Sequence, residues 1–152
     1  MRVSARADYA IRALVELAAS AGEAPIRGEA LARAQAIPAK YLENLLADLR
    51  RARLVASQRG SEGGYRLARP AGDISLADVI RAIDGPLAGV RGEAPEDVEY
   101  PGAAASLRDV WIALRAGMRA VLESVTVADV AAGRLPATVT SLLSEPGAWA
   151  RR

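Results

Sequence analysis

The most constraining feature of this sequence lies in residues 37–70, which read IPAKYLENLLADLRRARLVASQRGSEGGYRLARP. Pro38 suits the first position of a helix, because its fixed φ is already helical and its missing N–H would have no partner there. Four leucines follow at spacings of three and four residues and so share one face of a helix: Leu42, Leu45, Leu46 and Leu49. We predict a helix starting at Pro38, with one face in the core and the other able to meet a partner.

A β-hairpin is predicted directly after this helix. Residues 54–58 and 64–68 look like two short strands, and the RGSEGG turn between them supplies small residues where positive φ angles are needed. A short helix over residues 28–34, with Leu31 facing inward, precedes the Pro38 helix across a tight turn. Two helices separated by a tight turn and followed by a wing form a winged helix-turn-helix. The expected fold class is therefore mainly α with a small β-hairpin wing.

Two further helices are expected on either side of this unit. The first begins near Ser4, a suitable N-cap, and ends before Gly22, with apolar positions reaching Ala21. The other follows Ser75, which stands at capping-box spacing from Asp78, and stops at Gly85-Pro86. Its inward face is predicted to carry Leu76, Val79, Ile80 and Ile83.

The remaining residues predict a loop, a long helix and a short one. Residues 85–104 mix Gly, Pro and acidic residues without periodicity, so we expect a poorly ordered loop. A helix over about residues 103–124 carries a near-heptad apolar stripe, and an exposed stripe of that length needs a partner. Thr126 and Asp129 repeat the capping-box spacing and predict a short final helix. The tail over residues 134–152 is expected to be flexible despite Trp149.

Charge is distributed unevenly along the chain. Residues 1–69 hold twelve Arg or Lys against seven Asp or Glu, a net charge of +5, whereas residues 70–152 hold eight against eleven, a net charge of −3. Nineteen of the twenty cations are Arg, which makes bidentate contacts to phosphates and bases that Lys does not. An Ala- and Arg-rich genome produces the same bias without selection for contacts. The basic half is nevertheless the half that contains the predicted wing.

The composition argues against several classes of protein. The chain contains no Cys and no His, which excludes disulfides, thiol switches, cysteine-held iron–sulfur clusters and the ordinary zinc sites. Ser57, Ser61 and Ser75 have no His to activate them, which leaves only a Ser-Lys pair with Lys40 formally open to an enzyme. The GSEGG turn lacks the GxxxxGK[ST] pattern of a nucleotide-binding loop. We expect a protein that is not an enzyme.

A cytoplasmic location is the default expectation. No run of about 18 or more apolar residues occurs, and the amino terminus carries Arg6 and Asp8 in place of an apolar signal core. We therefore expect no contact with a membrane.

Four separate blocks resemble the Rrf2 family of bacterial winged helix-turn-helix regulators, which includes the IscR, NsrR and CymR types. The blocks are SARADYAIRALVELA, IPAKYLENLLADLRRARLV, RGSEGGYRLARPAGDISLADVIRAIDGPL and LRDVWIALRAGMRAVLESVTVADVA, in that order. They cover roughly residues 1–133 at the expected spacings. The resemblance implies a winged helix-turn-helix DNA-binding domain over 1–84, a loop over 85–104, and a dimerisation helix with the short final helix over 105–133.

The resemblance implies that the protein forms a homodimer and that this dimer binds an inverted repeat in double-stranded DNA. Each recognition helix enters a major groove, with half-sites about 34 Å apart or a multiple of that distance. The implied DNA-binding set is Lys40, Tyr41, Glu43, Asn44, Arg50, Arg51, Ser57, Arg59, Gly63 and Gly64. The implied dimer interface is Leu107, Val110, Trp111, Leu114, Met118, Val121, Leu122 and Val125.

Within that set, the resemblance places Tyr41, Glu43 and Asn44 nearest the base edges, and Arg59 in the adjacent minor groove. Lys40, Arg50 and Arg51 would then face phosphates. The chemistry fits, since Asn pairs with adenine, Glu accepts from cytosine, and Arg suits a narrow minor groove. Two alternatives without a role in DNA binding stay open. Glu43 can also be a solvated charge on the helix surface, and Arg59 can be an ordinary turn arginine.

The chain departs from the family at its sensing region. Members that sense oxidants or nitric oxide carry three cysteines where this chain has residues 90–106. Here the corresponding places hold Glu93, Glu99 and Ala105, with Arg108 near a histidine of some relatives. Asp8 matches a cluster ligand of some relatives and is read here as a carboxylate on a helix surface. Carboxylates alone do not hold an iron–sulfur core, so we expect no cofactor and no metal.

Three functional hypotheses follow. The leading one is a clusterless, DNA-binding repressor whose affinity is set by a protein partner or a small-molecule effector at the loop and dimer interface. The second is a protein-interaction module that regulates a metabolic enzyme, with DNA binding secondary. An enzyme is the weakest of the three.

Overall fold

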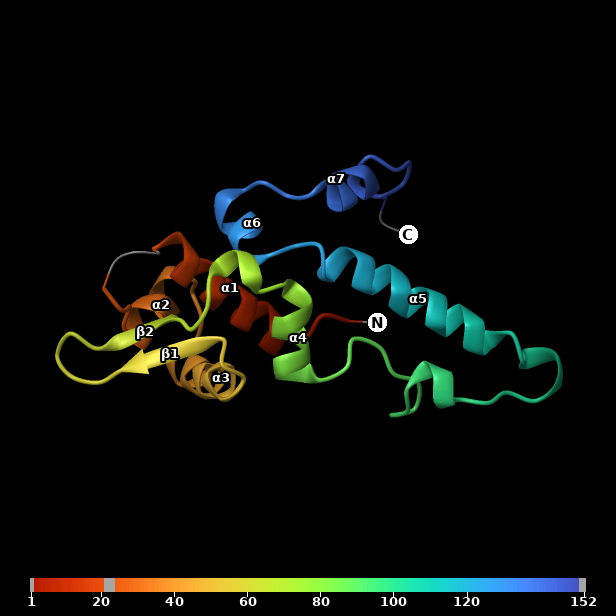
Figure 1. The fold of residues 1–152 in the computed structure, drawn as a ribbon, viewed down its shortest axis with the longest axis horizontal. Helices are drawn as coiled ribbons and strands as arrows, with labels where there is room; N and C mark the ends of the chain where they lie inside the picture. The colour runs from red at the N-terminus through yellow and green to blue at the C-terminus, as the bar shows by residue number, and fades with distance from the viewer. Residues whose placement is uncertain (1, 21–23, 151–152) are drawn as a thin grey trace.

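The computed structural model describes residues 2–20 and 24–150, with a winged-helix unit at one end and a long helix that projects away from it (Figure 1). The helices are α1 (Ala5–Ala19), α2 (Gly28–Ala34), α3 (Ala39–Arg51), α4 (Leu76–Asp84), α5 (Leu107–Leu122), α6 (Val127–Ala132) and α7 (Ala137–Leu143). The strands are β1 (Val55–Gln58) and β2 (Gly64–Leu67), and the 3₁₀ turns are η1 (Ala71–Asp73), η2 (Pro95–Asp97) and η3 (Gly102–Ala104). This architecture confirms the predicted fold class.

Helix α1 forms the centre of the winged unit. The Ser4 hydroxyl caps it by accepting a hydrogen bond of 2.9 Å from the backbone N–H of Ala7, as the sequence predicts. Its buried face is made largely of alanines, which allow neighbouring helices to approach closely, and α1 contacts α2, α3, α4 and α6. The predicted position Ala21 lies outside the described residues.

Helix α3 packs against this centre through the predicted leucine stripe. All four leucines are at most 1% exposed: Leu42, Leu45, Leu46 and Leu49. Burying a leucine side chain stabilises the fold by roughly 1.5–3 kcal/mol, so the stripe fixes which side of α3 faces solvent. Pro38 is the N-cap rather than the first helical residue, so the helix begins one position later than predicted. Helix α2 has the predicted bounds, and Leu31 is fully buried.

The hairpin pairs β1 with β2 in antiparallel register, with Ser57 opposite Tyr65 and Gln58 opposite Gly64. A third segment joins it, because Ile26 and Tyr65 exchange backbone hydrogen bonds of 2.9 and 2.7 Å. The wing is therefore anchored to the residues that lead into α2.

Helices α4 and α6 have the predicted capping boxes, Ser75 with Asp78 and Thr126 with Asp129. The two N-termini lie side by side, since the N–H of Leu76 donates to the carbonyl of Val125 over 2.9 Å. The sequence pattern predicts α6 in one unit with the long helix, whereas in the structure α6 packs on α1 inside the winged unit and its Val127 is fully buried.

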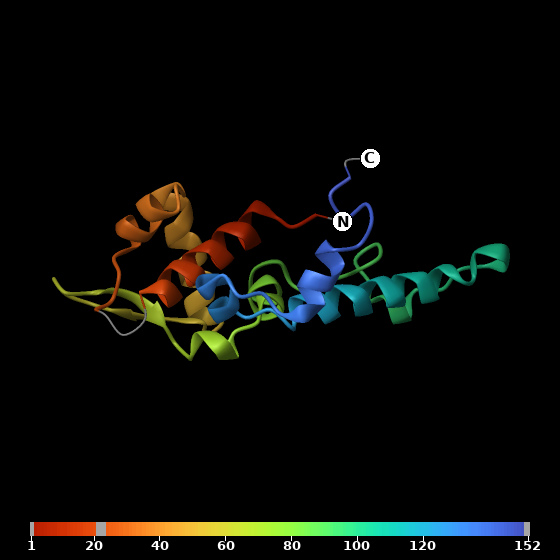
Figure 2. The ribbon, with the colours of Figure 1, turned by 90° about the horizontal axis from the view of Figure 1, so that it is seen from above.

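Two segments contain short helical elements that the sequence did not predict. Residues 85–104 contain η2 and η3, and Val98 of this segment is 1% exposed. The tail contains α7, which contacts α5 and, seen from above, overlaps the end of α5 that leads to α6 (Figure 2). Within the described residues, no helix combines the length and the apolar character needed to span a bilayer.

Candidate DNA-binding face

The surface of α3 opposite the leucine stripe is polar and exposed. It presents Lys40, Tyr41, Glu43 and Asn44 on the first turns of the helix and Arg50 and Arg51 at its end. Six of the predicted DNA-binding residues are thus exposed on α3, with Tyr41 and Arg50 at opposite edges of this surface because nine residues separate them. Whether each contacts DNA stays a prediction.

The amino-terminal end of α3 is held in place by α1. The Tyr41 ring packs edge-on against Tyr9, with ring centroids 5.7 Å apart. The guanidinium of Arg12 lies over the same Tyr9 ring, 5.3 Å from its centroid, and Arg12 also donates to the side chain and the carbonyl of Gln35. The Gln35 amide in turn donates to Glu16 over 2.6 Å. This network joins α1 to the turn between α2 and α3.

Sequence reasoning missed this network. Tyr9 and Arg12 stand three residues apart on α1, a spacing that places them on one helix face, but nothing local indicates that their partners lie beyond α2. Arg12 also pairs with Asp8 over 3.2 Å, so the Asp8 carboxylate has a structural partner.

The carboxyl-terminal end of α3 contacts the wing. Arg50 donates to the hydroxyl of Ser57 on β1 over 3.3 Å, so these two predicted residues lie side by side. Arg51 instead pairs with Asp48, a carboxylate that also receives Arg6 over 2.7 Å. A phosphate that binds Arg51 would therefore compete with Asp48.

The tip of the wing is tied back to the start of α2. Arg27 donates to the carbonyl of Ser61, and this contact adds to the backbone pairing of Ile26 with Tyr65. Arg59 is exposed beside this tip. The position of Arg59 relative to α3 is thus set by both the hairpin and the Arg27 contact, which sequence reasoning also missed.

The two predicted glycines have a backbone role in the structure. A Cβ on Gly63 would lie 2.3 Å from the carbonyl oxygen of Gln58, and one on Gly64 would lie 2.5 Å from the carbonyl carbon and oxygen of Ile26. Gly63 is buried, and Gly64 is half-buried. Both positions therefore require glycine for packing of the wing, and a direct contact with DNA through either stays a prediction.

Helix α5 presents much of the predicted dimer stripe to solvent. Val110 is 53% exposed and Leu114 is 43% exposed, and Leu107 is also exposed. Trp111 is half-buried, because its indole N–H donates to the hydroxyl of Tyr100 over 3.0 Å. The remaining members within the helix are half-buried: Met118, Val121 and Leu122.

Val125 does not belong to this stripe and, unlike the rest of the predicted set, is not expected to reach a dimer partner. Helix α5 ends at Leu122, and the chain then turns into the winged unit, where Val125 is 3% exposed and its carbonyl accepts from Leu76. Its side chain is already covered by its own protomer.

Comparison with known proteins agrees with this architecture. The Rrf2 family model, described as an iron-dependent transcriptional regulator, matches residues 3–133. Rv1287 of Mycobacterium tuberculosis, named an HTH-type transcriptional regulator, is 53% identical over 145 residues, which cover 95% of this chain and 90% of the relative. The HTH-type transcriptional regulator CymR of Bacillus subtilis is 36% identical over 131 residues, covering 86% of this chain and 90% of the relative.

Solved structures give the same result. The structure of CymR, the global cysteine regulator of B. subtilis, superposes with a TM-score of 0.75 at 34% identity, covering 88% of this chain and 98% of that one. IscR of T. potens superposes with a TM-score of 0.70, also at 34% identity, covering 88% of each chain.

The family is described as iron-dependent, but this chain lacks the residues that would bind an iron–sulfur cluster. Iron–sulfur clusters need thiolate ligands, sometimes joined by histidine, and the sequence has neither residue. Glu93 and Glu99 are exposed, Ala105 offers no ligand, and Arg108 is a cation. Among residues 2–20 and 24–150, no three acidic side chains gather closely enough to hold a metal ion.

The fold, the order of the sequence blocks and the relatives lead to one conclusion. A family model that spans residues 3–133 includes the winged unit and the long helix together. The relatives and the solved neighbours are regulators of transcription rather than enzymes. The chain belongs to the Rrf2 family of winged helix-turn-helix transcriptional regulators.

Proposed function

We propose that the protein is a homodimeric repressor that binds an inverted-repeat operator in the cytoplasm and does so without an iron–sulfur cluster. The observation that carries this proposal is the exposed polar side of α3 beside the wing. Four buried leucines and the Tyr9–Tyr41 contact hold that side in one orientation, the Arg50–Ser57 contact joins the end of α3 to β1, and the Arg27 contact ties the wing tip to the start of α2. A rigid pair of this kind suits simultaneous contact with two neighbouring grooves.

The residues divide by chemistry into base readers and phosphate binders. Tyr41, Glu43 and Asn44 stand where a helix in the major groove meets base edges, and the Asn amide is suited to the N6 and N7 positions of adenine. Arg59 suits a narrow minor groove, which attracts cations. Lys40, Arg50 and Arg51 provide charge for phosphates, as in other proteins whose phosphate contacts orient them without reading sequence.

The dimer is supported by the exposed part of α5. Leu107, Val110 and Leu114 would remain in water in a single protomer, and a second copy packed on the same face would cover them. Two-fold symmetry then places two α3 helices on half-sites of opposite orientation, which is an inverted repeat. A dimer that covers an operator within a promoter excludes the polymerase without any further contact, so repression is the proposed outcome.

The proposal is tested by sequencing genomic fragments captured by the purified protein. We expect one inverted repeat to be enriched over random DNA. Asn44→Ala should lose discrimination at one base pair of each half-site by about 1–3 kcal/mol. Arg59→Ala should weaken binding to all fragments, and Arg134→Ala, which removes an exposed arginine from the end of α6, should leave binding unchanged.

The salt dependence gives a second measure. Binding should weaken steeply as salt increases, because each neutralised phosphate releases counterions. Lys40→Ala, which removes one of the proposed phosphate contacts, should reduce the slope of log K against log salt by about 1. Enrichment of no sequence would contradict the proposal, and a full cellular effect in the Asn44→Ala, Arg59→Ala double variant would favour the interaction-module hypothesis instead.

A further inference from the structure

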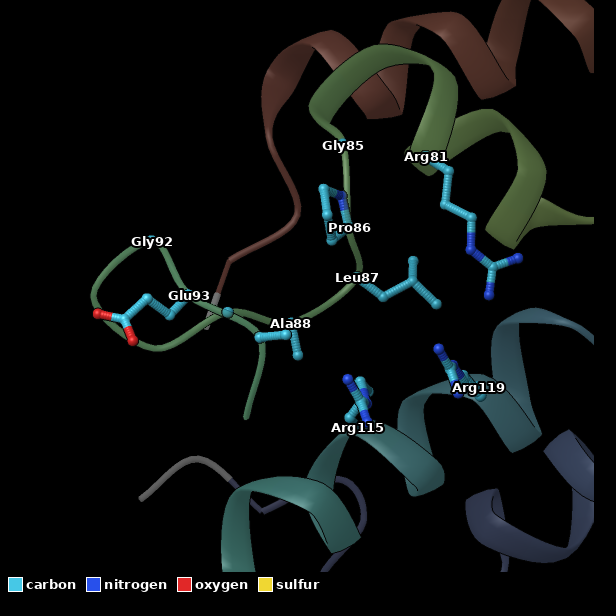
Figure 3. A pocket seen from close by; sticks show the side chains of 11 residues that line it. Arg81, Gly85, Pro86, Leu87, Ala88, Gly92, Glu93, Arg115 and Arg119 are labelled. Atoms are coloured by element: carbon cyan, nitrogen blue, oxygen red, sulfur yellow. The ribbon is translucent and has the colours of Figure 1, made fainter. Parts of the chain in front are cut away.

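A pocket of about 580 Å³ lies between α4, the segment that follows it and α5 (Figure 3). One part of its wall is apolar and consists of Pro86, Leu87 and Ala88. Three arginines form the other part: Arg81 from α4, and Arg115 and Arg119 from successive turns of α5. In Figure 3 the Leu87 side chain extends between Arg81 and Arg119, so apolar and cationic groups face the same space.

The three arginines retain hydrogen-bonding capacity toward the pocket. Arg81 pairs with Glu123, and Arg115 pairs with Glu96. A guanidinium has five N–H donors, and each of these contacts uses one nitrogen, so donors remain on both side chains. Among the described residues, Arg119 has no ion-pair partner, and the only acidic residue in the pocket lining is Glu93.

The positive charges of Arg115 and Arg119 also act on the neighbouring carboxylate of Glu96. A hydrogen bond that the Glu96 carboxylate accepts from its own backbone N–H, a hydrogen bond from Arg115 and the positive charges of Arg115 and Arg119 hold the pKa of Glu96 below its ordinary value. Glu96 therefore stays ionised as the partner of Arg115. Arg81 and Arg115 are each paired with a glutamate, so the guanidinium of Arg119, with the donors left on the other two arginines, is the feature that suits an anion beside the apolar wall.

We propose that this pocket binds a small organic anion whose carboxylate or phosphate group is held by Arg119 together with Arg81 and Arg115. The planar fork of a guanidinium matches both acidic groups in the same bidentate way. The short apolar part of such a metabolite lies against Pro86 and Leu87. If the proposed function holds, this pocket is the binding site for a small-molecule effector that acts in place of a cluster.

The position of the pocket couples it to DNA binding. Helix α4 contacts α1 and α3, whereas α5 carries the proposed dimer interface, and the Arg81–Glu123 pair joins these two parts. A bound acidic group competes with Glu123 for Arg81, so the occupied and empty pockets differ in how α4 is joined to α5. In a dimer this changes the spacing of the two α3 helices. The coupling rests on the proposed function, whereas the anion site does not.

The test uses the full chain and measures its thermal unfolding and its heat of binding with two probes. Inorganic phosphate and succinate are titrated at constant ionic strength, with chloride and the neutral succinamide as controls. We expect saturable binding of at least one probe, which identifies the acidic group. Arg119→Gln should weaken that binding about tenfold, and Arg119→Lys, which keeps the charge without the fork, should weaken it less.

Arg108→Gln is the matched control, because Arg108 is an exposed arginine on α5 that lies outside this pocket. It should bind the probe like the wild type. Saturable binding of neither probe, or equal binding by Arg119→Gln and the wild type, would overturn the anion site.

Operator affinity measured with and without the bound probe separates the two proposals. A protein that binds the operator but neither probe refutes the pocket alone, and one that binds a probe but no DNA sequence refutes the proposed function alone. We expect the probe to change the operator Kd by about fivefold or more, a typical size for allosteric coupling. An unchanged Kd at probe saturation would overturn the coupling.

Discussion

Replacement of Gly64 by alanine tests whether the wing is held by its backbone contact with the start of α2. The added Cβ would lie 2.5 Å from the carbonyl carbon and oxygen of Ile26 and 2.9 Å from the backbone nitrogen of Arg27. These are backbone atoms that cannot rotate away, so Ile26 and Tyr65 must separate. Their two hydrogen bonds, 2.9 and 2.7 Å long, would be lost.

The expected magnitude follows from those two bonds. At about 1 kcal/mol for each net hydrogen bond, with some added loss of packing, the variant should be destabilised by about 2–3 kcal/mol. For a chain of this size, each kcal/mol lowers the unfolding midpoint by about 2–4 °C, so we expect a decrease of about 4–12 °C. Operator affinity should fall at least as far as in Arg59→Ala, because the whole wing tip shifts.

Circular dichroism melting and fluorescence anisotropy with a labelled operator would measure both effects. Gly72→Ala is the control, because a Cβ on Gly72 meets no atom within 4 Å, and this variant should match the wild type in both assays. If Gly64→Ala melted with the wild type and bound the operator equally well, the proposed anchoring of the wing would be refuted.

Three further predictions concern the dimer and the short helix α6. Leu114→Glu places two like charges in the dimer interface and should give monomers in analytical ultracentrifugation. Ala116→Glu, on the opposite side of α5, should leave the dimer intact. A dimeric Leu114→Glu protein would contradict the proposed interface. Val125→Ala should lower the free energy of unfolding by about 2 kcal/mol in urea while the protein stays dimeric, since this side chain is buried within the protomer. Hydrogen bonds from the Thr126 hydroxyl and backbone hold the pKa of Asp129 below its ordinary value of 3.8, so the carboxylate stabilises the fold above that pH and loses this effect as the pH falls. Asp129→Asn should therefore be less stable than the wild type at pH 7, and the difference should shrink towards pH 3. A variant as stable as the wild type at pH 7 would contradict the capping role.

Local signals account for the parts of the fold that the sequence predicts well. The leucine stripe of α3, the bounds of α2, and the two capping boxes depend on residues that are three or four positions apart. Such spacings act within one or two helical turns, so they can be read without knowledge of the tertiary structure.

The missed features depend on contacts between distant residues. The pairing of Ile26 with Tyr65 and the contact of Arg12 with Gln35 join segments whose local sequences carry no mark of one another. Val125 shows the converse error, since it continues the apolar repeat of α5 in sequence although the helix has already ended. Periodicity identifies an apolar face but does not tell which partner covers it.

Order in residues 85–104 was missed for a similar reason. The segment has no periodicity, but Val98 is buried, and Tyr100 accepts the hydrogen bond from Trp111 on α5. Glu96 pairs with Arg115 of the same helix. These contacts come from α5 rather than from the segment's own sequence, and Arg115 of the Glu96 pair also lines the proposed anion pocket.

The central claim is that two copies of the winged unit place their α3 helices and wings on one operator. Hydroxyl-radical footprinting of the protein on the captured operator tests this most directly. We predict two protected regions related by the two-fold axis of the repeat, with centres about 34 Å apart or a multiple of that distance, each flanked by minor-groove protection that Arg59→Ala removes. A single protected region, or protection that is unchanged in Arg59→Ala, would contradict the account.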